Sequence, residues 1–179
     1  MSQSVALSVS IAVLGAIWAY LALGPLSSFT LVWAGFIAWG CFFHSGGDNN
    51  ALAKTIVGTI YGAIIGWIAL LIVVKVPVPA LGTFWPAIVV GVTVFFLVIV
   101  ASIDLLSAVP ANVYGYAAIV GYTLSKGATG ALTAGSAANP LVLMIISLII
   151  GALFGYASGK LAGVLTSSGG TETAKAKQA

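Results

Sequence analysis

The chain has 179 residues, of which 61% are hydrophobic and only 5% are charged, and its formal net charge is +3. Soluble domains are about 45–50% apolar and about 25% charged, so this composition excludes an ordinary soluble protein and predicts an all-α integral membrane protein. The positive charge is small and scattered and gives no indication of a nucleic-acid partner. The single cysteine, Cys41, excludes an intrachain disulfide.

About six transmembrane helices are expected, in a single domain that covers residues 1–165. The first runs from about Val5 to Leu23 and ends at Gly24-Pro25, because proline cannot continue a helix. The polar residues 166–179 are expected to form a disordered tail. The remaining spans are predicted, in chain order, at about Phe29–Phe43, Ala51–Val74, Phe84–Ile103, Ala111–Leu124 and Pro140–Leu165.

The second and fifth spans are short, rich in aromatic residues, and followed by glycine-rich loops. A helix over Phe29–Phe43 would be only about 22 Å long, which is less than the ~30 Å of a bilayer core. Gly40 and Gly46 lie 81 positions before Gly121 and Gly127. Short segments at matching positions of two halves indicate the transport site in transporters built from inverted repeats.

The third and sixth spans carry matching glycine ladders. Because glycine lacks a Cβ, such ladders let two membrane helices pack closely, although exposed glycine backbone can also line a pathway. We interpret the matches as a duplication, with repeat 1 at about residues 5–75 and repeat 2 at about 84–165; the alternative is chance similarity. Three spans per unit make this a 3+3 inverted repeat. The ladder residues are Gly58, Gly62, Gly66, Gly151, Gly155 and Gly159.

Side chains of the two short spans are the candidates for lining a pathway. Aromatic rings of the second span would form a narrow constriction that passes small neutral molecules, or they would simply face lipid. Polar groups of the fifth span would face a cavity, or they would form hydrogen bonds between helices. The predicted lining residues are Trp33, Phe36, Trp39, Phe43, Asn112, Tyr114, Tyr116, Gly121 and Tyr122.

Five polar residues near the ends of these spans are candidate gates. Histidine side chains in general can change charge near neutral pH, so His44 is a candidate proton or pH gate, and Asp48 and Asn50 follow it in the same loop; the alternatives are an interfacial histidine and helix caps. Lys126 would attract an anion, or its side chain would reach toward the membrane surface. Asn139 precedes Pro140 and is similar to the asparagine of aquaporin half-helices, which donates to a passing solute.

The chain without its tail resembles the YcdZ-like family of small bacterial inner-membrane proteins of unknown function. The residues that carry this resemblance are Trp33-Ala34-Gly35-Phe36, the Gly46-Gly47 loop, and residues 151–156 with the sequence GALFGY. The resemblance implies a bacterial cytoplasmic membrane and about six spans. It implies no substrate and no site residues.

The sequence favours a small homo-oligomeric channel or facilitator. The spans carry almost no charge, which indicates a small neutral or weakly polar solute such as urea, a short amide, ammonia or a small alcohol. The alternatives are a proton- or ion-coupled secondary transporter and a non-transporting membrane partner or scaffold protein. No enzyme, cofactor or metal site is predicted, because the chain has one histidine and no catalytic set. The distribution of the lysines between the two sides of the membrane favours a cytoplasmic location for both termini.

Overall fold

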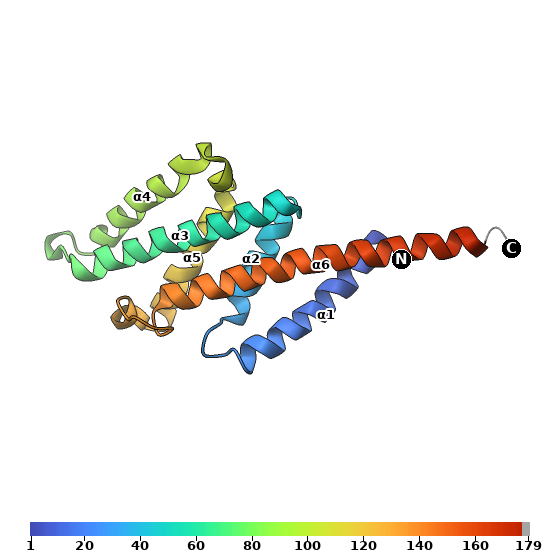
Figure 1. Cartoon of the computed structure of the whole chain (residues 1–179). Coiled ribbons are helices and arrows are strands. Elements are labelled where there is room, and N and C mark those ends of the chain that lie inside the picture. The colour runs from blue at the N-terminus through green and yellow to red at the C-terminus, as the bar shows by residue number, and fades with distance from the viewer. Residues whose placement is uncertain (177–179) are drawn as a thin grey trace.

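The computed structural model describes the backbone of residues 1–176 and the side chains of residues 1–166. All regular structure in this part of the chain is helical, which confirms the predicted all-α class (Figure 1). The six α-helices are α1 (Gln3–Leu23), α2 (Val32–His44), α3 (Asn49–Lys75), α4 (Phe84–Ile99), α5 (Val109–Ser125) and α6 (Pro140–Ala176).

Four of these helices are long and apolar enough to cross a membrane. They are α1, α3, α4 with the short turn that follows it, and α6 as far as Thr166. α2 has 13 residues and α5 has 17, so at about 1.5 Å per residue both are shorter than the ~30 Å bilayer core. The prediction of about six helices is therefore confirmed, while only four of them reach the length of a full span.

The helix boundaries follow from local chemistry. Asp48 accepts a hydrogen bond from the backbone N–H of Ala51 at 2.7 Å and so caps α3. Asn139 accepts one from the N–H of Leu141 at 2.9 Å at the start of α6. α5 ends at Ser125, two residues before Gly127, whose positive φ of 61° an L side chain rarely adopts.

Helix α6 is longer than expected. The sequence analysis ends the last span at Leu165 and places a disordered tail at 166–179, whereas α6 continues to Ala176. The chain has no proline after Pro140, so nothing interrupts the helical hydrogen bonds beyond the last apolar residue. Residues 177–179 lie outside the described part of the chain.

Two close helix pairs form the centre of the bundle. α3 packs along α5, where a Cβ on Gly62 would overlap the carbonyl oxygen of Asn112 and a Cβ on Gly115 would overlap that of Thr59. α2 packs along α6, where a Cβ on Gly151 would overlap the backbone of Gly35. In both pairs the backbones touch directly.

The other glycines of each ladder contact the same neighbouring helix as Gly62 and Gly151 do. A Cβ on Gly58 would lie 2.7 Å from the Ala111 side chain, and one on Gly66 would lie 2.8 Å from Ile119 of α5. On α6, a Cβ on Gly155 would lie 3.1 Å from Phe42 and from Trp39, and one on Gly159 would lie 3.8 Å from Phe42. The ladders therefore pack helices together inside this chain.

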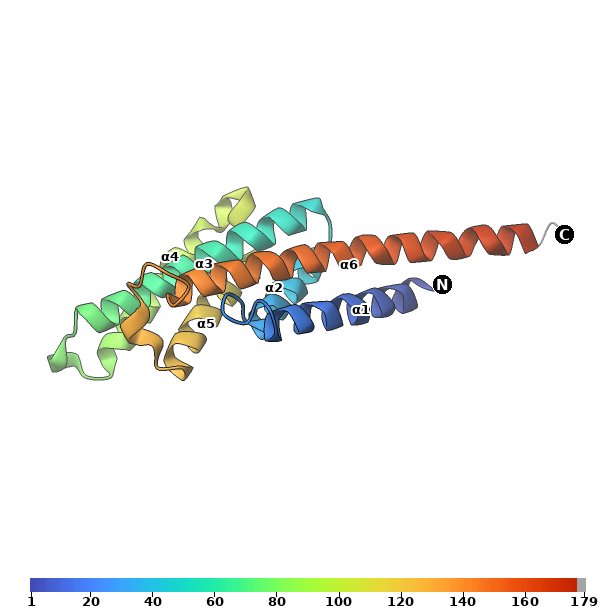
Figure 2. The same cartoon turned by 60° about the horizontal axis from the view of Figure 1, so that its bottom comes forward.

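The two pairs run in opposite directions. Gly58 and Gly66 of α3 meet the beginning and the middle of α5, so these two helices are parallel. Leu31 at the start of α2 donates to the hydroxyl of Ser147, and Trp39 donates to that of Ser158, so α2 and α6 are parallel too. Figures 1 and 2 show α3 and α6 running antiparallel across the middle, with α4 outside α3 and α1 beside α6.

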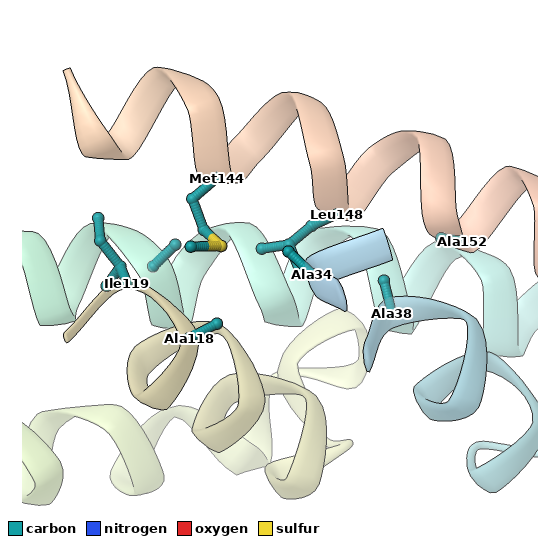
Figure 3. Close-up of a cluster of buried hydrophobic side chains, with 8 residues drawn as sticks. Ala34, Ala38, Ala118, Ile119, Met144, Leu148 and Ala152 are labelled. Carbon is teal, nitrogen blue, oxygen red and sulfur yellow. The ribbon is translucent and has the colours of Figure 1, made fainter. Parts of the chain in front are cut away.

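A core of mostly small side chains joins the two pairs. Figure 3 shows Met144, Leu148 and Ala152 of α6 above Ala34 and Ala38 of α2 and Ala118 and Ile119 of α5. All seven are buried, and Ala63 of α3 completes the cluster. Alanine at these positions lets four helices meet at one place, so α2 and α5 lie side by side on one face of the bundle.

Substituting the contact glycines tests this arrangement. Gly62→Ala and Gly115→Ala should each lower the free energy of unfolding by about 1–3 kcal/mol, because the new methyl group overlaps rigid backbone. Gly91→Ala is the matched control, since a Cβ there meets nothing within 4 Å and α4 gains helix propensity. Thermal stability of the purified protein in detergent measures the effect. Equal melting temperatures for Gly62→Ala and Gly91→Ala would contradict the backbone contact.

Candidate functional site

A groove of about 690 Å³ lies between α2 and α5. Its volume falls within the range of about 300–1,000 Å³ that is typical of small-molecule sites. Every residue that lines it belongs to α2, to α5 or to the residue directly after α5. The lining consists of Trp33, Phe36, Ile37, Gly40, Cys41 and His44 on one side and Tyr114, Ala117, Ala118, Gly121, Tyr122, Ser125 and Lys126 on the other.

The two walls of the groove match residue by residue. Trp33 and Tyr114, Gly40 and Gly121, and His44 and Ser125 are pairs with the same separation of 81 positions, and all six line the groove. Phe36, Ile37 and Cys41 match Ala117, Ala118 and Tyr122 in the same way. The sequence match between the two short spans therefore coincides with the two sides of one cavity.

Each end of the groove combines the start of one helix with the end of the other. The ion pair between Lys54 Nζ and Asp104 Oδ1, at 2.9 Å, holds the turn before α5 against the first residues of α3, which follow directly on the end of α2. Trp33 at the start of α2 therefore shares an end with Lys126, and Tyr114 at the start of α5 shares the other end with His44. Figure 1 shows α2 and α5 running in opposite directions.

The groove carries several groups that can donate a hydrogen bond and have no partner among the described residues. The indole N–H of Trp33, the hydroxyls of Tyr114 and Tyr122, and the ammonium group of Lys126 make no hydrogen bond to any described residue. No aspartate or glutamate among the described residues lines the groove. Asp48 caps α3 and Asp104 pairs with Lys54, so both carboxylates of the described chain are engaged elsewhere.

The middle of the groove is apolar and open. Gly40 and Gly121 face each other's helix without side chains, and a Cβ on either would meet nothing within 4 Å. Phe36 is 42% exposed there and stacks on Trp39 with ring centroids 5.6 Å apart. An apolar solute of moderate size has room at this point without displacing protein atoms.

Five of the nine predicted lining residues lie in the groove, namely Trp33, Phe36, Tyr114, Gly121 and Tyr122. The other four pack elsewhere. Trp39 is buried and donates to Ser158, and Phe43 lies edge-on to Phe42. Asn112 is fully buried and donates to the carbonyls of Leu97 and Leu106, while the Tyr116 hydroxyl pairs with that of Thr93 at 3.0 Å.

The candidate gates fall in three places. His44 and Lys126 lie at opposite ends of the groove. Asp48 and Asn50 line a separate cavity of about 590 Å³ against α6, beside Tyr156 and Lys160. Asn139 is buried and donates to the carbonyls of Leu132 and Ala134, so it holds the loop before α6 in shape.

The sequence analysis left out six residues that line the groove: Ile37, Gly40, Cys41, Ala117, Ala118 and Ser125. Most are small, and single small residues in a membrane helix carry no signal by themselves. The available signal was the separation of 81 positions between the two walls. Ile37 and Ala118 have this separation from each other, and each of the other four has it from a residue that the sequence analysis had chosen as a lining or gate candidate. Among the described residues there is no group of three or more His, Cys, Asp or Glu side chains that could hold a metal ion.

Comparison with known proteins identifies a family whose function is unknown. A family model described as a protein of unknown function (DUF1097) matches residues 8–163. No curated protein and no solved structure matches the chain. The match covers all six helices apart from the ends of α1 and α6.

Reaction with a water-soluble thiol reagent tests whether the groove holds water. In a Cys41→Ser background, Ala117→Cys and Gly121→Cys should react rapidly, because thiolates form in water and both positions line the groove. Val92→Cys is the control, since that side chain is 53% exposed on α4 but lies outside the groove. Labelling rates in membrane vesicles provide the measurement. Equal, slow rates at all three positions would show that lipid fills the groove.

Proposed function

The chain belongs to the DUF1097 family of proteins of unknown function, and we propose that it is a membrane channel or facilitator for a small neutral or weakly polar solute. The groove between α2 and α5 is the observation that carries this proposal. It is the meeting place of the two helices too short to span a bilayer, and its ends carry polar side chains. A solute that enters at one end passes the bare backbone of Gly40 and Gly121 and leaves at the other.

The charges around the groove support an uncharged solute over a cation. A driving proton or sodium ion usually needs a carboxylate within the membrane, and no carboxylate of the described residues reaches the groove. His44 and Lys126 are its titratable residues with basic side chains, and they lie at the ends rather than in the middle. Permeation down a gradient fits this pattern better than strong ion coupling, which remains the alternative function.

We further propose that the fold is a 3+3 inverted repeat. The pairing of α3 with α5 corresponds to the pairing of α6 with α2 under this repeat, and α4 lies against α3 as α1 lies against α6. Ser147 of α6 contacts the backbone N–H of Leu31, and the aligned Gly58 would place a Cβ 3.5 Å from that of Asn112. The opposite directions of the two pairs support an axis in the membrane plane.

The membrane setting completes the proposal. The exposed aromatic and apolar side chains of α1 and α4 face lipid, and a second copy of the chain closes the open side of the groove to form a homo-oligomer. The resemblance to YcdZ-like proteins supports a bacterial cytoplasmic membrane, and the distribution of the lysines supports both termini in the cytoplasm. Transport rather than catalysis is the proposed activity.

Solute flux into proteoliposomes tests the proposed function. Stopped-flow light scattering should show that the protein accelerates entry of one or more of urea, acetamide, benzamide and glycerol. Gly121→Leu should reduce that flux toward the level of empty liposomes, because its side chain fills the middle of the groove. Gly91→Leu on α4 is the control and should keep the flux. Flux no faster than in empty liposomes for every solute would exclude the proposal.

A further inference from the structure

The groove has a chemical preference that narrows its solute to one class. We propose that it binds a planar, ring-bearing molecule with a carbonyl oxygen, such as an aromatic amide, and that the carbonyl lies at the end formed by Trp33, Tyr122 and Lys126. This inference rests on the proposed function, because the solute that crosses the membrane is the one that the groove binds.

The donors of the groove select a solute that accepts hydrogen bonds. An indole N–H and an ammonium group only donate, and neither Trp33 nor Lys126 has a partner among the described residues. A tyrosine hydroxyl both donates and accepts, so it can also accept from the N–H of an amide, whereas no carboxylate of the described residues lines the groove to bind a cation. A carbonyl oxygen satisfies these donors, whereas an ammonium group would meet Lys126 with the same charge.

The two ends of the groove differ in their number of donors. Tyr122 lies in the last turn of α5 and Lys126 directly follows that helix, and the antiparallel arrangement brings Trp33 of α2 to the same end. The opposite end has the Tyr114 hydroxyl and the imidazole of His44. The first end therefore offers the larger number of donor groups, which is why the carbonyl is placed there.

The middle of the groove selects the body of the solute. Gly40 and Gly121 leave both walls flat, and Phe36 presents a 42% exposed ring beside them. Aromatic rings gain from stacking on such a ring in addition to the area that they bury. The groove of about 690 Å³ is also much larger than a molecule such as urea needs. A ring in the middle with its carbonyl at one end uses both features.

Equilibrium binding of radiolabelled benzamide to the full-length protein in lipid nanodiscs tests the inference. Competition should rank unlabelled benzamide well above acetamide, which has the carbonyl without the ring, and above benzylamine, which has the ring with a cation. If acetamide or benzylamine competes as well as benzamide, the proposed class is wrong.

Tyrosine-to-phenylalanine variants test the position of the carbonyl, since they remove one hydroxyl and keep the ring. Tyr122→Phe should weaken benzamide binding by about 2- to 10-fold, as expected for one lost hydrogen bond. Tyr20→Phe, which lies outside the groove and is 73% exposed on α1, should leave binding unchanged, and Tyr114→Phe, at the other end of the groove, should weaken it less than Tyr122→Phe does. A loss with Tyr114→Phe and none with Tyr122→Phe would overturn the placement.

The outcome of this experiment can be separated from that of the flux assay. Flux of urea or glycerol without binding of benzamide would remove the ring-bearing class and leave the channel. Specific binding of benzamide without flux of any solute would remove the channel and show that the groove is a receptor site for this class.

Discussion

The architecture depends on the contact of helix backbones at glycine. At Gly62 and Gly115 the carbonyl oxygens of Asn112 and Thr59 occupy the positions where Cβ atoms would stand, and Gly151 meets Gly35 in the same way. In a bilayer the hydrophobic effect does not drive helices together, so close packing supplies the attraction between them. These contacts hold α3 to α5 and α2 to α6 along their lengths, and the remaining helices attach to these two pairs.

The third helix of each half packs against the second helix of the other half. α3 follows α2 in the chain but packs most closely on α5, and α6 follows α5 but packs most closely on α2. The short helices are therefore each held from behind by a long helix of the other half. Their front faces meet each other, and the groove is the space that remains between them. The alanine-rich core in Figure 3 lies directly behind this meeting point.

Polar groups inside the bundle show why residue type alone did not identify the lining. Trp39, Asn112 and Tyr116 have the polar side chains expected of a pathway, yet each forms a side-chain hydrogen bond to another helix. Unpaired donors in hydrocarbon are costly, so a membrane helix satisfies them either within the protein or in a cavity. Trp33, Tyr114 and Tyr122 have the same chemistry and no such partner. The two sets of residues differ in the direction in which their side chains point from the helix.

The sequence by itself determined the membrane class, the helix positions to within a few residues except for the end of α6, the role of the glycine ladders in packing, and the correspondence between the two short spans. These follow from composition, hydrophobic length and the absence of a Cβ, which are local properties. Only the tertiary structure decided which face of α2 and α5 is open, because that depends on the long helix packed behind each of them. It also placed Gly40 and Cys41 in the groove and Asn112 outside it, since neighbouring positions on a helix point about 100° apart and only the packing partner fixes which of them is buried.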